Sequence, residues 1–139
     1  MNKNILVFRT DRIGDLLHNC PSIKTIKEEN RDDHLSLVAS ERNYLYAKTF
    51  DFIDKVYLFP KKNIFKKINL FKNLYKKKYQ KIYIFDGKDR SILMSIFLRS
   101  KIKVAKVSNK KQAFLCRLFN IKTSNDVFGV DLNLAHQKL

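Results

Sequence analysis

The chain has 139 residues, of which 45% are hydrophobic, so we expect one domain with one packed core rather than a disordered chain. Lys and Arg number 29 against 13 Asp and Glu, and the net charge of +16 favours an anionic partner such as nucleic acid, acidic lipid or a phosphorylated glycan. A genome-wide bias toward Lys, Asn and Ile explains the same excess without any partner, and no apolar run approaches the ~20 residues needed to cross a membrane.

Strand and helix patterns alternate along the chain. Short apolar or alternating runs predict five strands, at residues 5–8, 34–39, 54–59, 81–85 and 102–107. Helical spacing of apolar residues predicts five helices, at residues 16–29, 41–49, 63–79, 89–99 and 111–119. This alternation predicts an α/β fold with a Rossmann-like open parallel sheet, in which right-handed crossovers give the strand order 3-2-1-4-5.

Two helices carry further expectations about how they pack. Pro21 lacks an amide hydrogen and predicts a kink or an irregular first turn in the helix over 16–29. In the helix over 89–99, we expect four apolar residues to face inward, namely Ile92, Leu93, Ile96 and Phe97.

The helix over 63–79 has an apolar stripe opposite a face of lysines. The stripe consists of Ile64, Ile68, Phe71 and Tyr75, and Phe65 and Leu74 lie beside it. Such a helix either lies on an anionic membrane or packs into the core with its lysines in solvent. We prefer the second interpretation for the apolar stripe, and the lysines could still orient the protein near acidic lipid.

The polar turn over residues 9–15, between the first strand and its helix, holds the first candidate site. Asp15 lies at the helix start, where the helix dipole favours a negative charge, and a carboxylate there can accept a proton from a hydroxyl. On spacing alone an N-cap is the more ordinary role. Gly14 is expected to let the backbone turn sharply and to leave room for a ligand. The turn holds four further candidates for binding an acceptor: Arg9, Thr10, Asp11 and Arg12. Guanidinium groups here are expected to bind phosphate or carboxylate groups of a ligand. The alternative is that Arg–Asp pairs only stiffen the loop.

A second polar turn, over residues 86–91, follows the fourth strand. With the order 3-2-1-4-5, strands one and four are neighbours, so both turns are expected to border the same crevice. The candidate binding residues here are Asp86, Lys88, Arg90 and Ser91. Asp86 at a strand end also has an ordinary interpretation as a loop or cap residue.

Several site classes are not expected. The chain has three glycines and neither a G-x-G-x-x-G nor a Walker A pattern, which argues against a classical dinucleotide or P-loop site. Cys20 and Cys116 lack metal-ligand spacing and are expected to be buried, reduced thiols, as in a reducing cytosol. The isolated histidines are expected to be structural, and the apolar stretch before Arg9 is too short for a signal peptide.

The opening of the chain resembles that of glycosyltransferase family 9, the heptosyltransferases that build lipopolysaccharide core. The matching residues are Arg9, Asp11, Ile13, Gly14, Asp15 and Pro21. Later segments resemble family segments in the same order, at residues 52–57, 79–86, 101–107 and 130–135. The resemblance implies the N-terminal half of a GT-B glycosyltransferase: an acceptor-binding domain over 1–125 and the start of an interdomain segment over 126–139.

The resemblance also implies an activity. Asp15 matches the family's proposed catalytic base, which deprotonates an acceptor-sugar hydroxyl that attacks a nucleotide-activated heptose with inversion. It implies an anionic lipopolysaccharide-core acceptor, no metal or bound cofactor, and a cytoplasmic location with peripheral contact to the inner membrane. The donor-site Asp-Ser-Gly-x-x-His signature is absent from the sequence, so the nucleotide-sugar would bind a missing C-terminal domain and the isolated chain would be inactive. The alternative is a non-catalytic basic module for anionic lipid or nucleic acid; no RRM, KH or helix-turn-helix signature supports nucleic acid.

Overall fold

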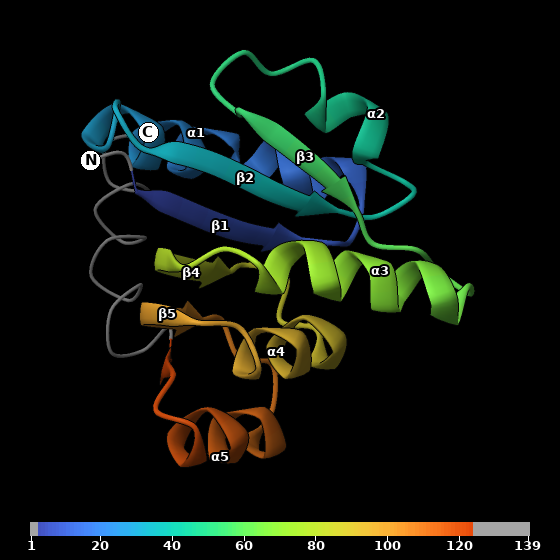
Figure 1. The fold of residues 1–139 in the computed structure, drawn as a ribbon, viewed down its shortest axis with the longest axis vertical. Coiled ribbons are helices and arrows are strands. Elements are labelled where there is room, and N and C mark those ends of the chain that lie inside the picture. The colour runs from blue at the N-terminus through green and yellow to red at the C-terminus, as the bar shows by residue number, and fades with distance from the viewer. Residues whose placement is uncertain (1–2, 124–139) are drawn as a thin grey trace.

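The computed structural model describes residues 3–123, which form a six-stranded parallel sheet covered by helices (Figure 1). The strands are β1 (Asn4–Arg9), β2 (His34–Ala39), β3 (Lys55–Leu58), β4 (Tyr79–Ile84), β5 (Ser100–Ala105) and β6 (Lys122–Thr123). The helices are α1 (Ile13–Glu29), α2 (Tyr44–Ala47), α3 (Ile64–Tyr75), α4 (Asp89–Ile96) and α5 (Lys110–Leu118).

The strand order is β3-β2-β1-β4-β5-β6, and every neighbouring pair is parallel. This confirms the predicted Rossmann-like order and adds β6, which the sequence patterns did not predict because it is only two residues long. The expected interdomain segment, 126–139, lies outside the described residues, as does the family-like segment 130–135.

The two faces of the sheet carry separate cores, because side chains alternate along each strand. On β1, Ile5 and Val7 face α1 and α2, where they pack with Leu16 and Ile23. The opposite face of the sheet packs against α3, α4 and α5, through core residues that include Leu6, Phe8, Leu74, Ile92 and Cys116. Figure 1 shows α1 behind the sheet and α3 and α4 in front of it.

Helix α1 differs from expectation at its start. It begins at Ile13 rather than at residue 16, so that Gly14 and Asp15 belong to its first turn. It continues through Pro21 to Glu29 as one helix, so the irregular first turn expected at Pro21 is not there. Pro21 instead lies in the helix interior, where the Leu17 carbonyl loses its usual amide donor.

The expected packing of α3 was only partly right: Leu74 is buried and Phe71 packs against the core, but the other residues of the expected stripe do not. Its buried residues are Leu70 and Leu74, whereas much of the predicted inward stripe faces solvent: Ile64 is 62% exposed and Ile68 and Tyr75 are each 47% exposed. The helix also ends at Tyr75 instead of 79. The chain must place Tyr79 in the core at the start of β4, and the Tyr79 hydroxyl donates to the Leu74 carbonyl near the end of α3 at 2.9 Å.

Two smaller expectations also need correction. In α4, Ile92 is fully buried as expected, but Leu93 and Phe97 are 47% and 63% exposed, because α4 contacts the sheet along a narrower stripe than predicted. Both cysteines are free thiols, and Cys116 is buried, but Cys20 is only half-buried.

Candidate active site at the carboxyl ends of β1 and β4

The two polar turns come together at one edge of the sheet. β1 and β4 are parallel neighbours, with Phe8 paired to Ile84, and the Phe85 amide donates to the Phe8 carbonyl at 3.0 Å. The chain therefore leaves both strands side by side, at the point where the strand order reverses. In open α/β sheets this point is where ligands bind. The prediction that turns 9–15 and 86–91 share one edge is thus confirmed in the positions of their backbones.

Asp86 is the centre of a buried hydrogen-bond network. Its Oδ2 accepts from the Thr10 amide at 3.1 Å and from the hydroxyls of Thr10 and Ser91 at 2.6 Å each. Its Oδ1 accepts from the Lys88 amide at 3.1 Å. Thr10, Asp86 and Ser91 are all buried. This network holds the two turns together, and direct contact of these three residues with an acceptor stays a prediction.

Arg90 closes this network from the outside. Its guanidinium donates to the Thr10 hydroxyl at 3.0 and 3.2 Å and to the Thr10 carbonyl. It also stacks over the ring of Phe59, 5.7 Å from the ring centroid. Because Arg90 remains exposed, its charge is still present at the surface of the site.

Arg9 lies buried between two carboxylates. Its Nε is 3.1 Å from Asp11 Oδ1 and its Nη2 is 3.5 Å from Asp15 Oδ1, while Nη1 donates to the Phe85 carbonyl. The Arg9 Nε–H does not point at Asp11 Oδ1, so this contact is an ion pair without a hydrogen bond. The geometry therefore includes the loop-stiffening pair weighed above, and binding of a ligand anion by Arg9 stays a prediction.

Asp11 has a carboxyl with a raised pKa. Its side chain is only 12% exposed. Burial raises the pKa of the Asp11 carboxyl to about 6; the Arg9 charge opposes this rise, and the charges of Asp15 and Asp86 add to it. Buried carboxyls next to like charges are common in active sites, although ion-pair networks with a structural role also produce them.

Asp15 is the most accessible carboxylate of the site, with 45% of its side chain exposed. It occupies the third position of α1, and its Oδ2 accepts from the Arg12 amide at 3.4 Å, a long hydrogen bond. It therefore contributes weakly to capping, from the third position rather than as the N-cap itself, which is Arg12. Its oxygens retain unused acceptor capacity, since an ionised carboxylate can accept about four hydrogen bonds.

Gly14 is exposed within the first turn of α1, and its backbone needs no glycine-specific φ. The expectation of a sharp turn there was wrong, because the helix already begins at Ile13. A Cβ added at Gly14 would meet no atom within 4 Å, so the space beside it is open. Arg12 and Lys88 are also exposed and bring positive charge to the two turns.

The sequence did not point to a third group of residues, which follows β2. The Ser40 hydroxyl donates to the Asp11 carbonyl at 2.6 Å, and the fully buried Asn43 donates to the Arg9 carbonyl at 2.9 Å. Together they fix the backbone of the first turn. The available signal was their place just after β2, the other neighbour of β1.

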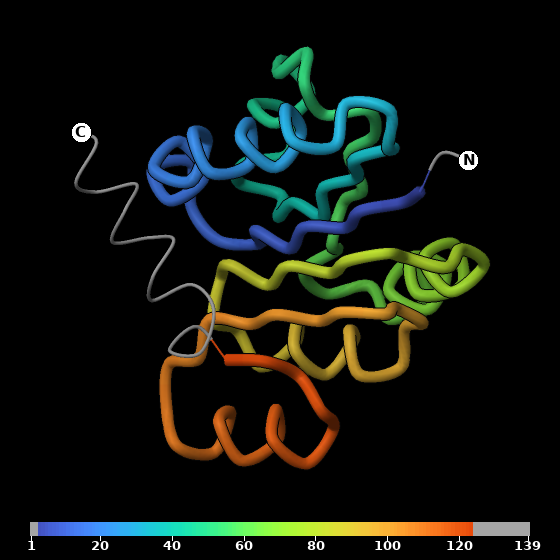
Figure 2. Tube along the Cα trace, turned by 90° about the vertical axis from the view of Figure 1, so that its left-hand side faces the viewer, coloured from blue at the N-terminus to red at the C-terminus, as the bar shows by residue number. Residues whose placement is uncertain are grey.

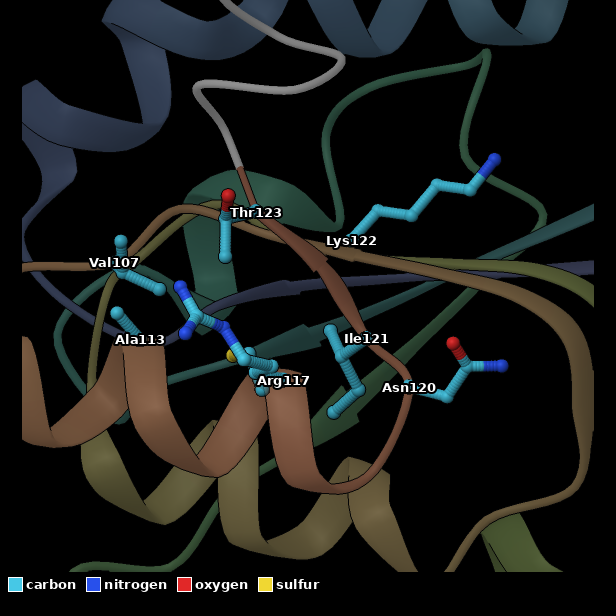
Figure 3. Close-up of a pocket in the computed structure, with 8 residues that line it drawn as sticks. Val107, Ala113, Arg117, Asn120, Ile121, Lys122 and Thr123 are labelled. Atoms are coloured by element: carbon cyan, nitrogen blue, oxygen red, sulfur yellow. The ribbon is translucent and has the colours of Figure 1, made fainter.

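Two cavities of about 450 Å³ each lie away from these turns. One lies beside α5 and β6, where Figure 3 shows its lining residues Val107, Ala113, Arg117, Asn120, Ile121, Lys122 and Thr123. The other lies at the amino ends of β1, β4 and β5 and is lined by residues that include Lys3, Lys78, Arg99 and Lys101. Neither of these two cavities includes a residue of turns 9–15 or 86–91.

Within residues 3–123, no group of three or more His, Cys, Asp and Glu side chains is placed to hold a metal ion. In the same part of the chain, no helix combines the length and apolar character needed to span a bilayer.

No protein-family model matches the sequence, and no curated protein matches it. Solved structures do match. The glycosyl transferase family 9 structure from Veillonella parvula DSM 2008 aligns with a TM-score of 0.70 and 18% identity, over 88% of this chain and 36% of that one. E. coli heptosyltransferase WaaC with ADP aligns with a TM-score of 0.71 and 15% identity, over 86% of this chain and 40% of that one.

The same E. coli heptosyltransferase with ADP-2-deoxy-2-fluoro heptose aligns with a TM-score of 0.66 and 15% identity, over 86% of this chain and 41% of that one. These matches confirm the resemblance to family 9 at the level of the fold, which is Rossmann-like as expected for one half of a GT-B enzyme. The chain spans 36 to 41% of the length of the structures it matches.

Proposed function

We propose that this chain is the acceptor-binding half of a glycosyltransferase of the family 9 kind, and that Asp15 is its general base. The shared fold with family 9 structures supports the class of enzyme. The placement of Asp15 at the carboxyl edge of β1, next to the β4 turn, supports its role. The E. coli relative was solved with ADP and with an ADP-heptose analogue, which supports a nucleotide-activated heptose or related sugar as the donor.

The observation that carries the proposal is the contrast between two carboxylates of the same site. Asp86 is buried, and three donors already bind its Oδ2. Asp15 is 45% exposed, and its two contacts are long, at 3.4 and 3.5 Å. Only a carboxylate with accessible oxygens can receive a proton from an incoming hydroxyl, so Asp15 fits the base and Asp86 fits a positioning residue.

In the proposed step, Asp15 accepts the proton of an acceptor hydroxyl while that oxygen attacks the anomeric carbon of the donor sugar. The bond from this carbon to the nucleotide diphosphate breaks, its electron pair leaves with the diphosphate, and the configuration inverts. The buried Arg9 places a positive charge next to Asp15, with Nη2 3.5 Å from Oδ1 of the carboxylate.

We further propose that the acceptor is an anionic, lipopolysaccharide-core type glycan. Arg12, Lys88 and Arg90 are exposed on the two turns, and guanidinium and ammonium groups suit phosphate and carboxylate substituents. On this proposal the nucleotide-sugar binds a separate donor-binding domain, corresponding to the part of the family 9 structures that this chain does not cover, and no metal ion takes part. The protein would act in the cytoplasm, where nucleotide-sugars are made.

Titration of the chain with a phosphorylated core oligosaccharide tests acceptor binding. We expect saturable binding, a loss of about tenfold in the double variant Arg12→Gln, Lys88→Gln, and little change in Asp15→Asn. A neutral oligosaccharide of similar size is the control ligand. Failure of the wild-type chain to bind the phosphorylated glycan would remove the acceptor-binding role.

Transfer is tested after the chain is joined to the donor-binding half of a family 9 enzyme. We expect Asp15→Asn to lower the turnover by about 100-fold or more, since general bases contribute roughly 10²–10⁴-fold. Asp51→Asn, at an exposed position outside the site, is the matched control and should retain transfer. Unchanged transfer by Asp15→Asn would exclude Asp15 as the base.

A further inference from the structure

The net positive charge of the protein comes from one part of the chain. Residues 1–54 contain 8 Lys and Arg and 9 Asp and Glu, whereas residues 55–123 contain 20 Lys and Arg and 2 Asp and Glu. A genome-wide composition bias would add lysines to both parts, so it does not explain this asymmetry. Figure 2 shows the blue-to-teal segments above β1 and the yellow-to-red segments below it, whereas β3, at the start of the basic part, lies beside β2 on the upper side.

The basic part also exposes large apolar side chains on neighbouring helices. We define the α3–α4 patch as Ile64, Phe65, Ile68, Tyr75, Leu93 and Phe97, whose exposed fractions range from 47% to 79%. The two helices meet within the patch through Phe71, which stacks on Tyr75 at 5.7 Å and contacts Phe97 edge-on at 6.4 Å. Phe71 therefore joins the two helices, and pairs of residues four apart, Ile64 with Ile68 and Leu93 with Phe97, share one face of their helix. Exposed surfaces of this kind mark interaction sites.

Cations border the α3 side of this patch without compensating acids, and α4 carries one acid, Asp89, in its first turn. No Asp or Glu occurs between Asp54 and Asp86, a stretch that includes the whole of α3. Lys62, Lys66, Lys72 and Lys76 are exposed along α3, and the Arg99 guanidinium lies 5.0 Å above the Tyr75 ring. Leu70 and Leu74 pack α3 against the core, so the exposed stripe of the helix takes no part in that packing.

We propose that the α3–α4 patch docks the protein on an anionic lipid bilayer. The apolar side chains enter the boundary between headgroups and acyl chains, and the surrounding lysines bind acidic headgroups, as in interfacial amphipathic helices. Nucleic acid would use the lysines and could stack on aromatic rings, but it offers no favourable surface for Ile64, Ile68 or Leu93. The inference does not depend on the proposed glycosyltransferase function, since it uses no residue of the candidate site.

Co-sedimentation of the chain with vesicles tests the proposal. We expect binding to vesicles of phosphatidylethanolamine with phosphatidylglycerol, little binding to phosphatidylcholine alone, and weaker binding as salt is raised. Phe65→Ser should weaken binding by about tenfold or more, because Phe65 is 79% exposed and contributes its ring to the bilayer. The double variant Lys62→Glu, Lys66→Glu should weaken it by about fivefold or more for each lysine.

Matched variants on the other part of the chain serve as controls. Leu45→Ser removes a 77% exposed leucine from α2, and Lys24→Glu with Arg31→Glu reverses two exposed charges outside the basic part. Both should bind the anionic vesicles like wild type. Acidic residues are favourable near a helix N-terminus, so circular dichroism should show Lys62→Glu, Lys66→Glu to be folded.

Three results would overturn the proposal: equal binding to both kinds of vesicle, equal losses in the control and patch variants, or Phe65→Ser binding as tightly as wild type. Preferential binding of a single-stranded oligonucleotide over the anionic vesicles in direct competition would also overturn it. The oligosaccharide titration above is done without lipid, so failure of one proposal is distinguishable from failure of the other.

Discussion

The carboxylate of Asp86 binds the hydroxyl of Thr10 at 2.6 Å, although 76 residues separate the two along the chain. Thr10 follows β1 and Asp86 follows β4, so this contact joins the turns at the reversal point of the sheet. Both side chains are buried, and Arg90 donates to the same Thr10 hydroxyl. The rigid frame behind the exposed Asp15 is therefore a hydrogen-bond network formed only in the folded protein.

Thr10→Val should destabilise the protein by about 1–3 kcal/mol, because it removes a hydroxyl that serves the buried Asp86 and Arg90 while keeping the side-chain shape. The urea concentration at the midpoint of unfolding measures the change, provided that wild type and variant have the same m-value, the slope of the unfolding free energy against urea concentration. Thr49→Val is the control, since Thr49 is exposed and its hydroxyl bonds only locally to Tyr46. Equal effects of the two variants would show that the network adds no stability.

The pH dependence of stability should reveal Asp11. Its pKa is about 6 in the folded protein and near the ordinary 3.8 when unfolded, so the folded state binds this proton more tightly between these values. Raising the pH from about 4 to about 6 therefore lowers the contribution of Asp11 to the free energy of unfolding. In Asp11→Asn this loss is absent, so the stability of the variant relative to wild type should rise between about pH 4 and pH 6, by roughly 2–3 kcal/mol.

Free energies of unfolding measured at intervals from pH 4 to pH 8 check the Asp11 prediction. The relevant quantity is the difference between variant and wild type at each pH, in which contributions from other groups largely cancel. A difference that stays constant over the whole range would contradict the raised pKa of Asp11.

Gly14→Ala should stabilise the protein by about 0.5–1 kcal/mol, since alanine favours the helix and the added Cβ meets no atom within 4 Å. The same methyl group would occupy the open space next to Asp15 where we place the acceptor. Thermal unfolding and titration with the phosphorylated core oligosaccharide measure the two effects. A stabilised variant that binds the glycan as tightly as wild type would show that the acceptor does not approach Gly14.

Gly87→Ala should have the opposite effect on stability. Gly87 has φ of 61°, and an added Cβ would lie 2.5 Å from Ser108 Oγ. We expect a loss of about 1–2 kcal/mol from the left-handed backbone alone. The double variant Gly87→Ala, Ser108→Gly removes the clash; Ser108→Gly alone is its baseline, because it also removes the hydrogen bond from the Ser108 hydroxyl to the Gly87 carbonyl at 3.0 Å. A neutral Gly87→Ala would contradict the backbone argument.

The order of elements was predictable because it depends on local patterns. Apolar runs such as residues 5–8 mark buried strands whatever surrounds them, and strands that alternate with helices leave few possible topologies. The positions of turns 9–15 and 86–91 at one edge followed from that order. Asp15, as the acidic residue of the first turn of α1, could likewise be chosen from the sequence.

The faces of the helices were less predictable. Apolar spacing suggested that Ile64, Ile68 and Tyr75 face the core, but these three are exposed. The buried residues are Leu74, predicted beside the stripe, and Leu70, which was not predicted. Both stripes have helical periodicity, and the rotation of α3 is set by how its neighbours fill the space above the sheet. The exposed stripe that results is the feature of α3 from which we propose a docking surface.

By itself, the sequence determined the α/β class, the parallel strand order and the turn that carries Asp15, because these follow from periodicity and chain direction. The tertiary structure alone decided which polar side chains are buried in mutual hydrogen bonds and which remain accessible. Asp86 and Asp15 look equivalent as acids after strands, yet only the packing of Thr10 and Ser91 around Asp86 uses its oxygens and leaves those of Asp15 open. Hydrogen-bond partners far apart in the chain are set by the fold, so no local pattern could have separated the two.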